Sequence, residues 1–423
     1  MNLTDAIKTR LTLLSFFQFF VWGAWLTTIG TYCTEGQGWS FPQFGAIFST
    51  LALSSILMPS LIGIIADKWM RAERLYGILH LTYGIFMLLI PQIAYFQGAY
   101  PALRNFEAYE ILYWLIFGGM LAYMPSISLS NSVSYRILKM NNLNVQTDFP
   151  KIRVWGTIGF IAAMWLTNLS GSKASANQFY IAGVGAILLG LYAFSLPACL
   201  PQGKTSDKKS LAAQLGLDAF KLFAEYRMAL FFVFSILLGA ALQLSNMYGD
   251  AYLSSFPKGT LVEKYSTIIY SISQVSETIF ILTIPFFLKR FGIKNVMLFA
   301  LLAWVLRYGF FAYGSTDFGV FLIVMSCIVY GMAFDFFLIS GSMFVEANTD
   351  SSIRSSAQGL FIMMTNGIGA YIGTVASSAL IGAFYILPDG QTDWQGAWLL
   401  FAGYSLVVAI LFLLLFKDKR QTA

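Results

Sequence analysis

Long apolar blocks are the feature that most constrains what this chain can fold into. Residues 11–32 and 228–252 form two such blocks, and each is long enough to cross a hydrocarbon core of about 30 Å as an α-helix. A soluble domain carries roughly 25% charged residues because its surface faces water. Here 57% of the 423 residues are hydrophobic and 11% are charged. Most of the surface must therefore face lipid, and the blocks predict a polytopic all-α membrane protein.

The blocks number twelve and fall into two sets of six. The first set is 11–32, 43–66, 75–96, 109–135, 153–169 and 177–197, and the second is 228–253, 264–288, 295–314, 318–345, 355–385 and 395–416. The longest polar stretch lies between the two sets. We therefore predict twelve transmembrane helices in an N-terminal half at 1–200, a cytoplasmic linker at 201–227 and a C-terminal half at 228–423. Such a plan is typical of transporters whose halves rock about a site near the bilayer midplane.

The distribution of basic residues predicts the orientation. With the N-terminus in the cytoplasm, 20 of the 26 Lys and Arg residues fall on the cytoplasmic side, four fall outside and two lie within spans. This bias follows the positive-inside rule, so we expect both termini to be cytoplasmic. The net charge of +6 then reflects topology and anionic headgroups, and we expect no nucleic-acid partner.

Cysteine and histidine usage gives no reason to expect a metal or a cofactor. Cys33, Cys199 and Cys327 are far apart and form neither a CxxC pair nor a disulfide framework. His80 is the one histidine, and we expect it to be packed and hydrogen-bonded. The block 11–32 is too long for a secretory signal peptide and lacks a small-residue cleavage site.

Polar and aromatic side chains inside the spans stand at helical spacing, which places each group on one helix face. A carboxylate at the bilayer centre costs about 2.5–3.5 kcal/mol, so such residues usually line a cavity or meet a partner. The groups are Arg153, Thr157 and Phe160; Gln243 and Asn246; Gln274 and Glu277; and Tyr330, Phe334 and Asp335.

Each group also has a structural alternative. Arg153 can extend to the headgroups, and Gln243 and Asn246 can join helices by hydrogen bonds. The aromatic residues can be ordinary packing, and Glu277 or Asp335 can pair with Arg153 or Arg307. As binding residues, amides pair with heterocycle edges or vicinal hydroxyls, and aromatic rings stack on bases or sugars. From the residues alone, the substrate is a nucleoside, a nucleobase or a sugar.

Five stretches narrow this choice. They read FVWGAWLTT at 20–28, TDFPKIRVWGTIGF at 147–160, SISQVSET at 271–278, YGMAFDFF at 330–337 and AQGLFIMMTNG at 357–367. The chain resembles the bacterial nucleoside:proton symporter family of the major facilitator superfamily over nearly its whole length. The resemblance implies a major facilitator fold, a monomer in the inner membrane of a bacterium, and nucleoside import with protons.

The family's nucleoside pocket carries over to positions that helical spacing already selects. The resemblance implies substrate binding by Arg153, Thr157, Phe160, Gln243, Asn246, Gln274, Glu277, Tyr330 and Phe334, and proton coupling by Glu277 and Asp335. Ala241 and Leu338 depart from the family pattern, since a permease of this family carries glutamate and asparagine there. The preference among nucleosides therefore stays open.

A short basic turn suggests a cytoplasmic gate. Gly63, Asp67, Lys68 and Arg71 fit the G-x-x-x-D-[RK]-x-x-[RK] turn of the major facilitator superfamily, and the basic turn 289–294 occupies the equivalent place in the second half. Glycine permits close helix approach, and the charges can lock a gate. The alternative is an ordinary charged loop.

Two other functions remain as alternatives. A sugar or oligosaccharide proton symporter of the same fold uses a similar polar and aromatic site. A membrane-embedded enzyme or a receptor is disfavoured, because the spans lack a catalytic constellation and no connection is long enough for an extramembrane domain.

Overall fold

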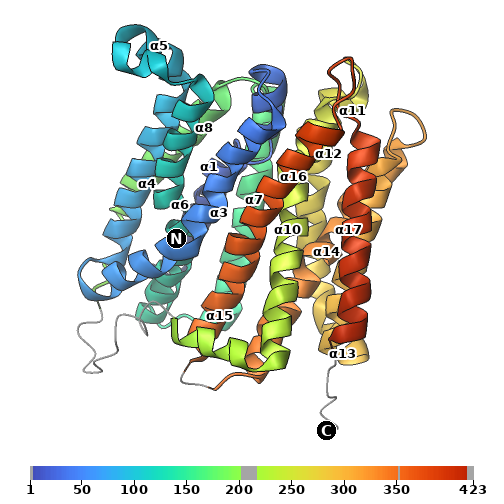
Figure 1. Cartoon of the computed structure of the whole chain (residues 1–423). Coiled ribbons are helices and arrows are strands. Elements are labelled where there is room, and N and C mark those ends of the chain that lie inside the picture. The colour runs from blue at the N-terminus through green and yellow to red at the C-terminus, as the bar shows by residue number, and fades with distance from the viewer. Residues whose placement is uncertain (1–2, 202–216, 351–352, 417–423) are drawn as a thin grey trace. The chain divides into compact units, whose positions relative to one another are not determined.

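The computed structural model of the chain describes residues 3–201, 217–350 and 353–416. The chain divides into two compact units, Met1–Leu215 and Gly216–Ala423. Both units are built from helices, and the described residues contain one isolated β-bridge, between Ile386 and Thr392. Long helices run side by side within each unit (Figure 1).

Unit 1 contains five long helices and several short segments. The long helices are α1 (Leu3–Gly23), α3 (Phe41–Lys68), α4 (Ala72–Leu89), α6 (Ala108–Met140) and α7 (Val145–Leu169), followed by the shorter α8 (Asn177–Ala193). The short segments are α2 (Ile29–Thr31), η1 (Tyr32–Gly36), η2 (Ile90–Gln92), α5 (Ile93–Ala99) and η3 (Pro101–Asn105). Helix α1 packs against α7, and α4 packs against α6 and α8. The α5 segment projects at one end of the unit (Figure 1).

Unit 2 is centred on α10 (Tyr226–Ser254), α13 (Ile272–Ala312) and α14 (Val320–Ala347). The other elements are η4 (Leu217–Ala224), α11 (Leu261–Lys264), α12 (Ser266–Tyr270), α15 (Arg354–Ile362), η5 (Met363–Gly369), α16 (Ala370–Phe384) and α17 (Trp394–Leu415). Helix α13 packs against α14 and α17, and α10 packs against η5 and α16. Most of the predicted linker 201–227 lies outside the described residues.

Local sequence signals explain where several helices begin. Ser40 caps α3 in a capping box, in which the Gln43 side chain accepts a 2.9 Å hydrogen bond from the Ser40 N–H. At the start of α17, the Asp393 carboxylate accepts a 3.0 Å hydrogen bond from the Gly396 N–H. These caps satisfy helix N–H groups that would otherwise lack a partner.

Two predicted boundaries are wrong, and a third is confirmed. The span predicted at 11–32 is interrupted, because α1 ends at Gly23, a poor helix former, and the chain turns before α2. The turn predicted at 63–71 is shorter, because α3 continues through Lys68 and the chain turns only at 69–71. The predicted turn at 289–294 is confirmed, because α13 breaks into two helical parts at Gly292, whose φ of 78° favours glycine.

Within the described residues, eight helices are long and apolar enough to cross a membrane, or nine when the bent pair 41–56 and 58–66 within α3 is taken as one span. The 17-residue α8 is shorter, and the segment Ser266–Ala312 counts once although Gly292 divides it. The prediction of a multi-pass helical membrane protein is confirmed. The number twelve stays a prediction.

Candidate functional site

Three amide side chains in unit 2 have no hydrogen-bond partner among the residues that the structure describes. Gln243 and Asn246 lie three residues apart on α10, and Gln274 lies on α13. Gln243 and Gln274 are each 7% exposed, and Asn246 is half-buried. Among the described residues none of these amides makes a side-chain hydrogen bond, and no described group donates to the fully buried Gln274 Oε1 atom. They therefore do not join helices by hydrogen bonds in this structure.

Aromatic and acidic groups of α14 lie beside α13. The rings of Tyr330 and Phe334 stack with centroids 5.5 Å apart and planes 24° apart. Asp335 is 4% exposed, and its Oδ2 atom has no hydrogen-bond partner. Glu277 of α13 is half-buried, and α13 packs against α14, which carries Asp335.

A close helix contact brings α13 and α14 together at this point. Gly331 of α14 faces the backbone of Ser276, where a Cβ atom would overlap the carbonyl group. The Ser276 hydroxyl donates a hydrogen bond to the Ile328 carbonyl of α14. Small residues at a helix interface allow this approach. The contact places Glu277 and Tyr330, which flank the small residues in sequence, on neighbouring helices.

Arg307 does not pair with either acid. Its guanidinium is fully buried and donates to the Ser245 hydroxyl at 2.7 and 2.9 Å, to the Ser326 carbonyl at 2.8 Å, and to the hydroxyls of Ser273 and Tyr270 at 3.3 Å. Among the described residues Asp335 forms no ion pair. The alternative in which Arg307 neutralises Asp335 is therefore wrong for this structure.

The remaining predicted binding residues lie on α7 in unit 1. The half-buried Arg153 guanidinium lies 3.9 Å from the centre of the Phe19 ring on α1, so it packs on an aromatic face. Thr157 is half-buried, and Phe160 is 9% exposed. The Phe160 ring meets Trp22 edge to face at 6.1 Å. Of the ten residues predicted to bind substrate or carry the proton, three lie in unit 1 and seven in unit 2.

A buried network around Gln18 in unit 1 was missed by the sequence interpretation. The Gln18 side chain accepts from Tyr76 at 2.6 Å, lies 3.0 Å from His80 Nε2 and donates to Ser126 at 3.1 Å. Its backbone carbonyl accepts from Tyr123 at 2.7 Å. The sequence signal for this network was Gln18 itself, a polar residue within the apolar block 11–32. The expectation that His80 is packed and hydrogen-bonded is confirmed.

The predicted gating turn contains an ion pair among the described residues of its own unit, and this pair involves Arg71. The Asp67 side chain lies outside the described residues. Within its own unit, Gly63 has open space where a Cβ atom would lie, so the expected close approach is absent there. Arg71 forms a 2.6 Å ion pair with Glu73, which is 1% exposed. Lys68 is exposed at the end of α3.

Glu73 also contacts the segment that follows α8. Glu73 accepts a 2.8 Å hydrogen bond from the Cys199 N–H, and the Cys199 carbonyl accepts a 3.1 Å bond from the Ala72 N–H. Burial, and secondarily the Glu73 charge, raise the pKa of the Cys199 thiol to about 11. Two backbone-directed bonds thus attach this segment to the start of α4.

Comparisons with known proteins show the family to which this chain is related. A family model described as "Nucleoside H+ symporter" matches residues 5–421. Nucleoside permease NupG of Escherichia coli (strain K12) is 46% identical over 419 residues, with 98% of this chain and 96% of that protein covered. Xanthosine permease of the same organism is 46% identical over 418 residues, with 97% of this chain and 96% of that protein covered.

A solved structure extends the similarity to the fold. A crystal structure of a point mutant of the nucleoside transporter NupG matches with a TM-score of 0.91 at 45% identity, covering 97% of this chain and 100% of that one. These relatives are transporters rather than enzymes. The protein is thus a multi-pass membrane transporter, and it belongs to the nucleoside H+ symporter family.

Proposed function

We propose that this protein imports nucleosides together with protons, by alternating access of two six-helix halves with a major facilitator fold. The halves are 1–200 and 228–423, joined by a cytoplasmic linker at 201–227. Family membership and the 46% identity to two nucleoside permeases support the substrate class and the proton. The sugar symporter alternative lacks comparable support.

One observation carries the assignment of the site. The Gln243, Asn246 and Gln274 amides and the Tyr330 hydroxyl make no hydrogen bonds among the described residues. By contrast, Gln18 and Arg307 are fully buried and hold several partners each. A buried polar group without a partner costs about 1–3 kcal/mol. A polar substrate that supplies those bonds would recover this free energy, and a nucleoside has matching donors and acceptors.

Each proposed residue then has a role that follows from its chemistry. Gln243, Asn246, Gln274 and Glu277 hydrogen-bond the nucleoside, and Arg153, Thr157 and Tyr330 add further polar contacts. Phe160 or Phe334 stacks on the base or the sugar. Glu277 and Asp335 carry the proton, because they are the two carboxyl groups on the helices that also carry Gln274, Tyr330 and Phe334.

The membrane placement is part of the proposal. Twelve spans follow from the count of apolar blocks, and cytoplasmic termini follow from the 20-to-4 distribution of basic residues. An inner-membrane location follows from the family, and we expect a monomer. The turn with Gly63, Asp67, Lys68 and Arg71 would then face the cytoplasm as part of the gate. The Arg71–Glu73 ion pair at 2.6 Å shows that at least one of its charges is engaged within unit 1.

Uptake into proteoliposomes tests the function. Purified protein should accumulate labelled uridine or adenosine on an inward proton gradient, and a protonophore should abolish accumulation. Excess unlabelled nucleoside should compete, and maltose or lactose should not. Accumulation that persists with the protonophore would rule out proton symport, and competition by the disaccharides would restore the sugar alternative.

A further inference from the structure

Arg307 is a buried cation without a buried anion beside it. Its side chain is fully enclosed in unit 2, and each of its three nitrogens donates to protein oxygens. Those oxygens belong to hydroxyl groups and one backbone carbonyl, and no carboxylate lies within ion-pair distance among the described residues. Burial of a charge is costly unless it is paired and hydrogen-bonded. Because burial of the Arg307 charge costs free energy, we expect this residue to have a role beyond helix packing.

The hydrogen bonds fix the plane of the guanidinium group. Ser245 belongs to α10, Tyr270 to α12, Ser273 to α13 and Ser326 to α14. The hydroxyls of Ser245 and Tyr270 also lie 3.0 Å from each other, and the Tyr270 hydroxyl donates to the Ser245 carbonyl at 2.8 Å. Partners from four helical segments leave the planar group one orientation.

In that orientation the guanidinium covers the ring of Tyr330. The Arg307 Cζ atom is 4.4 Å from the centre of the Tyr330 ring, compared with 5.1 Å for Phe311 and 5.6 Å for Tyr270. A desolvated cation over an aromatic face attracts it strongly. Tyr330 is therefore the aromatic ring that Arg307 contacts most closely.

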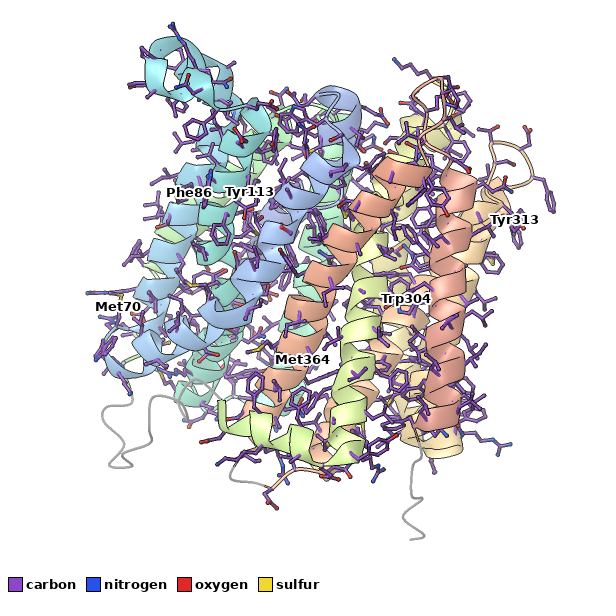
Figure 2. All side chains as sticks on the ribbon, viewed as in Figure 1. Met70, Phe86, Tyr113, Trp304, Tyr313 and Met364 are labelled. Atoms are coloured by element: carbon purple, nitrogen blue, oxygen red, sulfur yellow. The ribbon has the colours of Figure 1, made fainter. Side chains whose placement is uncertain are left out.

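The other contacts of Tyr330 also involve its ring alone. Trp304, labelled in Figure 2, meets it edge to face at 5.9 Å and 88°, and Phe334 stacks on it at 5.5 Å. The Tyr330 hydroxyl has no hydrogen-bond partner among the described residues, although the side chain is only 3% exposed. The ring is thus held in place while its hydroxyl remains available.

We propose that Arg307 is a positioning residue for nucleoside binding, which holds the Tyr330 ring so that its hydroxyl is presented to the substrate. This inference rests on the proposed function, because it assumes that Tyr330 contacts the nucleoside. Arg307 itself does not touch the substrate. Its charge acts through the ring face, and its hydrogen bonds supply the rigidity.

A double-mutant cycle separates this role from a purely structural one. Nucleoside affinity is measured by calorimetry, with uridine and adenosine, for Arg307→Met, Arg307→Lys, Tyr330→Leu and the two combinations. Arg307→Met should weaken binding about tenfold, as expected for loss of a desolvated cation–π contact, and Arg307→Lys should weaken it less because the charge remains. In the Tyr330→Leu background, neither Arg307 substitution should weaken binding further.

Tyr252→Phe is the matched control. It removes the 2.7 Å hydrogen bond from the Tyr252 hydroxyl on α10 to the Phe311 carbonyl on α13, one turn after Arg307, and the ring contacts of Tyr252 do not include Tyr330. Its melting temperature should fall while its nucleoside affinity stays unchanged. If Arg307→Met proves too unstable to purify, the cycle with Arg307→Lys decides the question.

The outcomes distinguish the two proposals. If Tyr330→Leu binds nucleoside as tightly as the parent protein, the proposed contact of Tyr330 fails and the role of Arg307 fails with it. If Tyr330→Leu weakens binding but the Arg307 variants bind normally, or lose the same factor in both backgrounds, only the positioning role is overturned. Loss of nucleoside affinity in Tyr252→Phe would also overturn the positioning role of Arg307, because it would show that removing any hydrogen bond between α10 and α13 weakens binding.

Discussion

The Glu73 carboxylate at the start of α4 accepts a hydrogen bond from the backbone N–H of Cys199, at 2.8 Å across 126 residues of sequence. The other oxygen of the same carboxylate pairs with Arg71 at 2.6 Å. Glu73 therefore joins the turn after α3, the start of α4 and the segment after α8. We therefore predict that loss of this contact lowers the stability of the folded protein whether or not substrate is bound.

Glu73→Gln should destabilise unit 1 by about 1–3 kcal/mol, because it replaces a charged acceptor of two bonds by a neutral one that is 1% exposed. Thermal unfolding of the purified protein measures the change. Glu346→Gln is the control, since Glu346 pairs with Arg354 at 3.0 Å on the surface, where ion pairs contribute about 0–1 kcal/mol. Equal shifts in the two variants would show that burial of Glu73 is unimportant.

Thiol reactivity should report the environment of Cys199. With its pKa raised to about 11, the thiol should react slowly with N-ethylmaleimide at pH 7–8, and faster as the pH approaches 11. Glu73→Gln should speed the reaction of a protein with Cys199 as its single cysteine. Reactivity at pH 7 equal to that of a free thiol would contradict the buried position.

The same thiol makes the stability depend on pH. Because the pKa of the Cys199 thiol is higher in the folded protein than in a free thiol, the neutral thiol contributes to the free energy of unfolding below about pH 9, and this contribution is lost as the pH rises toward 11.

Topology needs engineered cysteines, because Cys33 and Cys199 are both buried and do not report on sidedness. Tyr100 and Met140 are a matched pair at 57% and 56% exposure, predicted outside and inside respectively. In a cysteine-free background, an impermeant maleimide added to intact cells should label Tyr100→Cys and spare Met140→Cys. The labels should become equal after permeabilisation. Preferential labelling of Met140→Cys in intact cells would invert the proposed orientation.

Loss of one site residue should weaken nucleoside binding without unfolding the protein. Gln274→Ala removes one proposed hydrogen bond, which typically costs about 0.5–1.5 kcal/mol, and Phe334→Ala removes a proposed stacking ring, which costs about 1–3 kcal/mol. The expected loss of affinity is therefore several-fold to about a hundredfold by calorimetry. Unchanged affinity in both variants, with unchanged melting temperatures, would assign the two side chains to packing.

Neutral variants of the two acids should separate exchange from accumulation. One proton driven by about 100 mV supplies roughly 2.3 kcal/mol, enough for about fiftyfold accumulation. If Glu277 or Asp335 carries the proton, Glu277→Gln or Asp335→Asn should still exchange nucleoside at equal concentrations but should fail to concentrate it on a pH gradient. Full accumulation in both variants would exclude both acids as proton carriers.

Helical spacing was a sound guide to which residues share an element. Gln243 and Asn246 lie together on α10, and Tyr330 and Phe334 stack on α14, as the intervals of three and four residues predict. Helix boundaries were less predictable, because they depend on local geometry, as at Gly23, where α1 ends inside the predicted span 11–32. The turn predicted at 289–294 was an exception, since the positive φ of Gly292 separates two helical parts there.

The pairing of polar groups was not predictable from spacing. Arg307 was considered as a partner for an acid, and Gln18 and Glu73 were not singled out. Their partners lie far away in sequence, as with Gln18 and Ser126 across 108 residues and Arg307 and Ser245 across 62. Periodicity describes one helix at a time and contains no information on which faces meet.

The sequence by itself determined that most of the protein surface faces lipid and that the structure is helical. Long apolar blocks with few charges can satisfy their backbone hydrogen-bonding groups in lipid only as helices. It also determined which helix faces carry polar groups. Only the tertiary structure decided which of those groups are satisfied within the protein and which are left without a partner. The physical reason is that a hydrogen bond requires two groups within about 3 Å, and helix packing alone determines whether Arg307 meets Ser245 or Asp335.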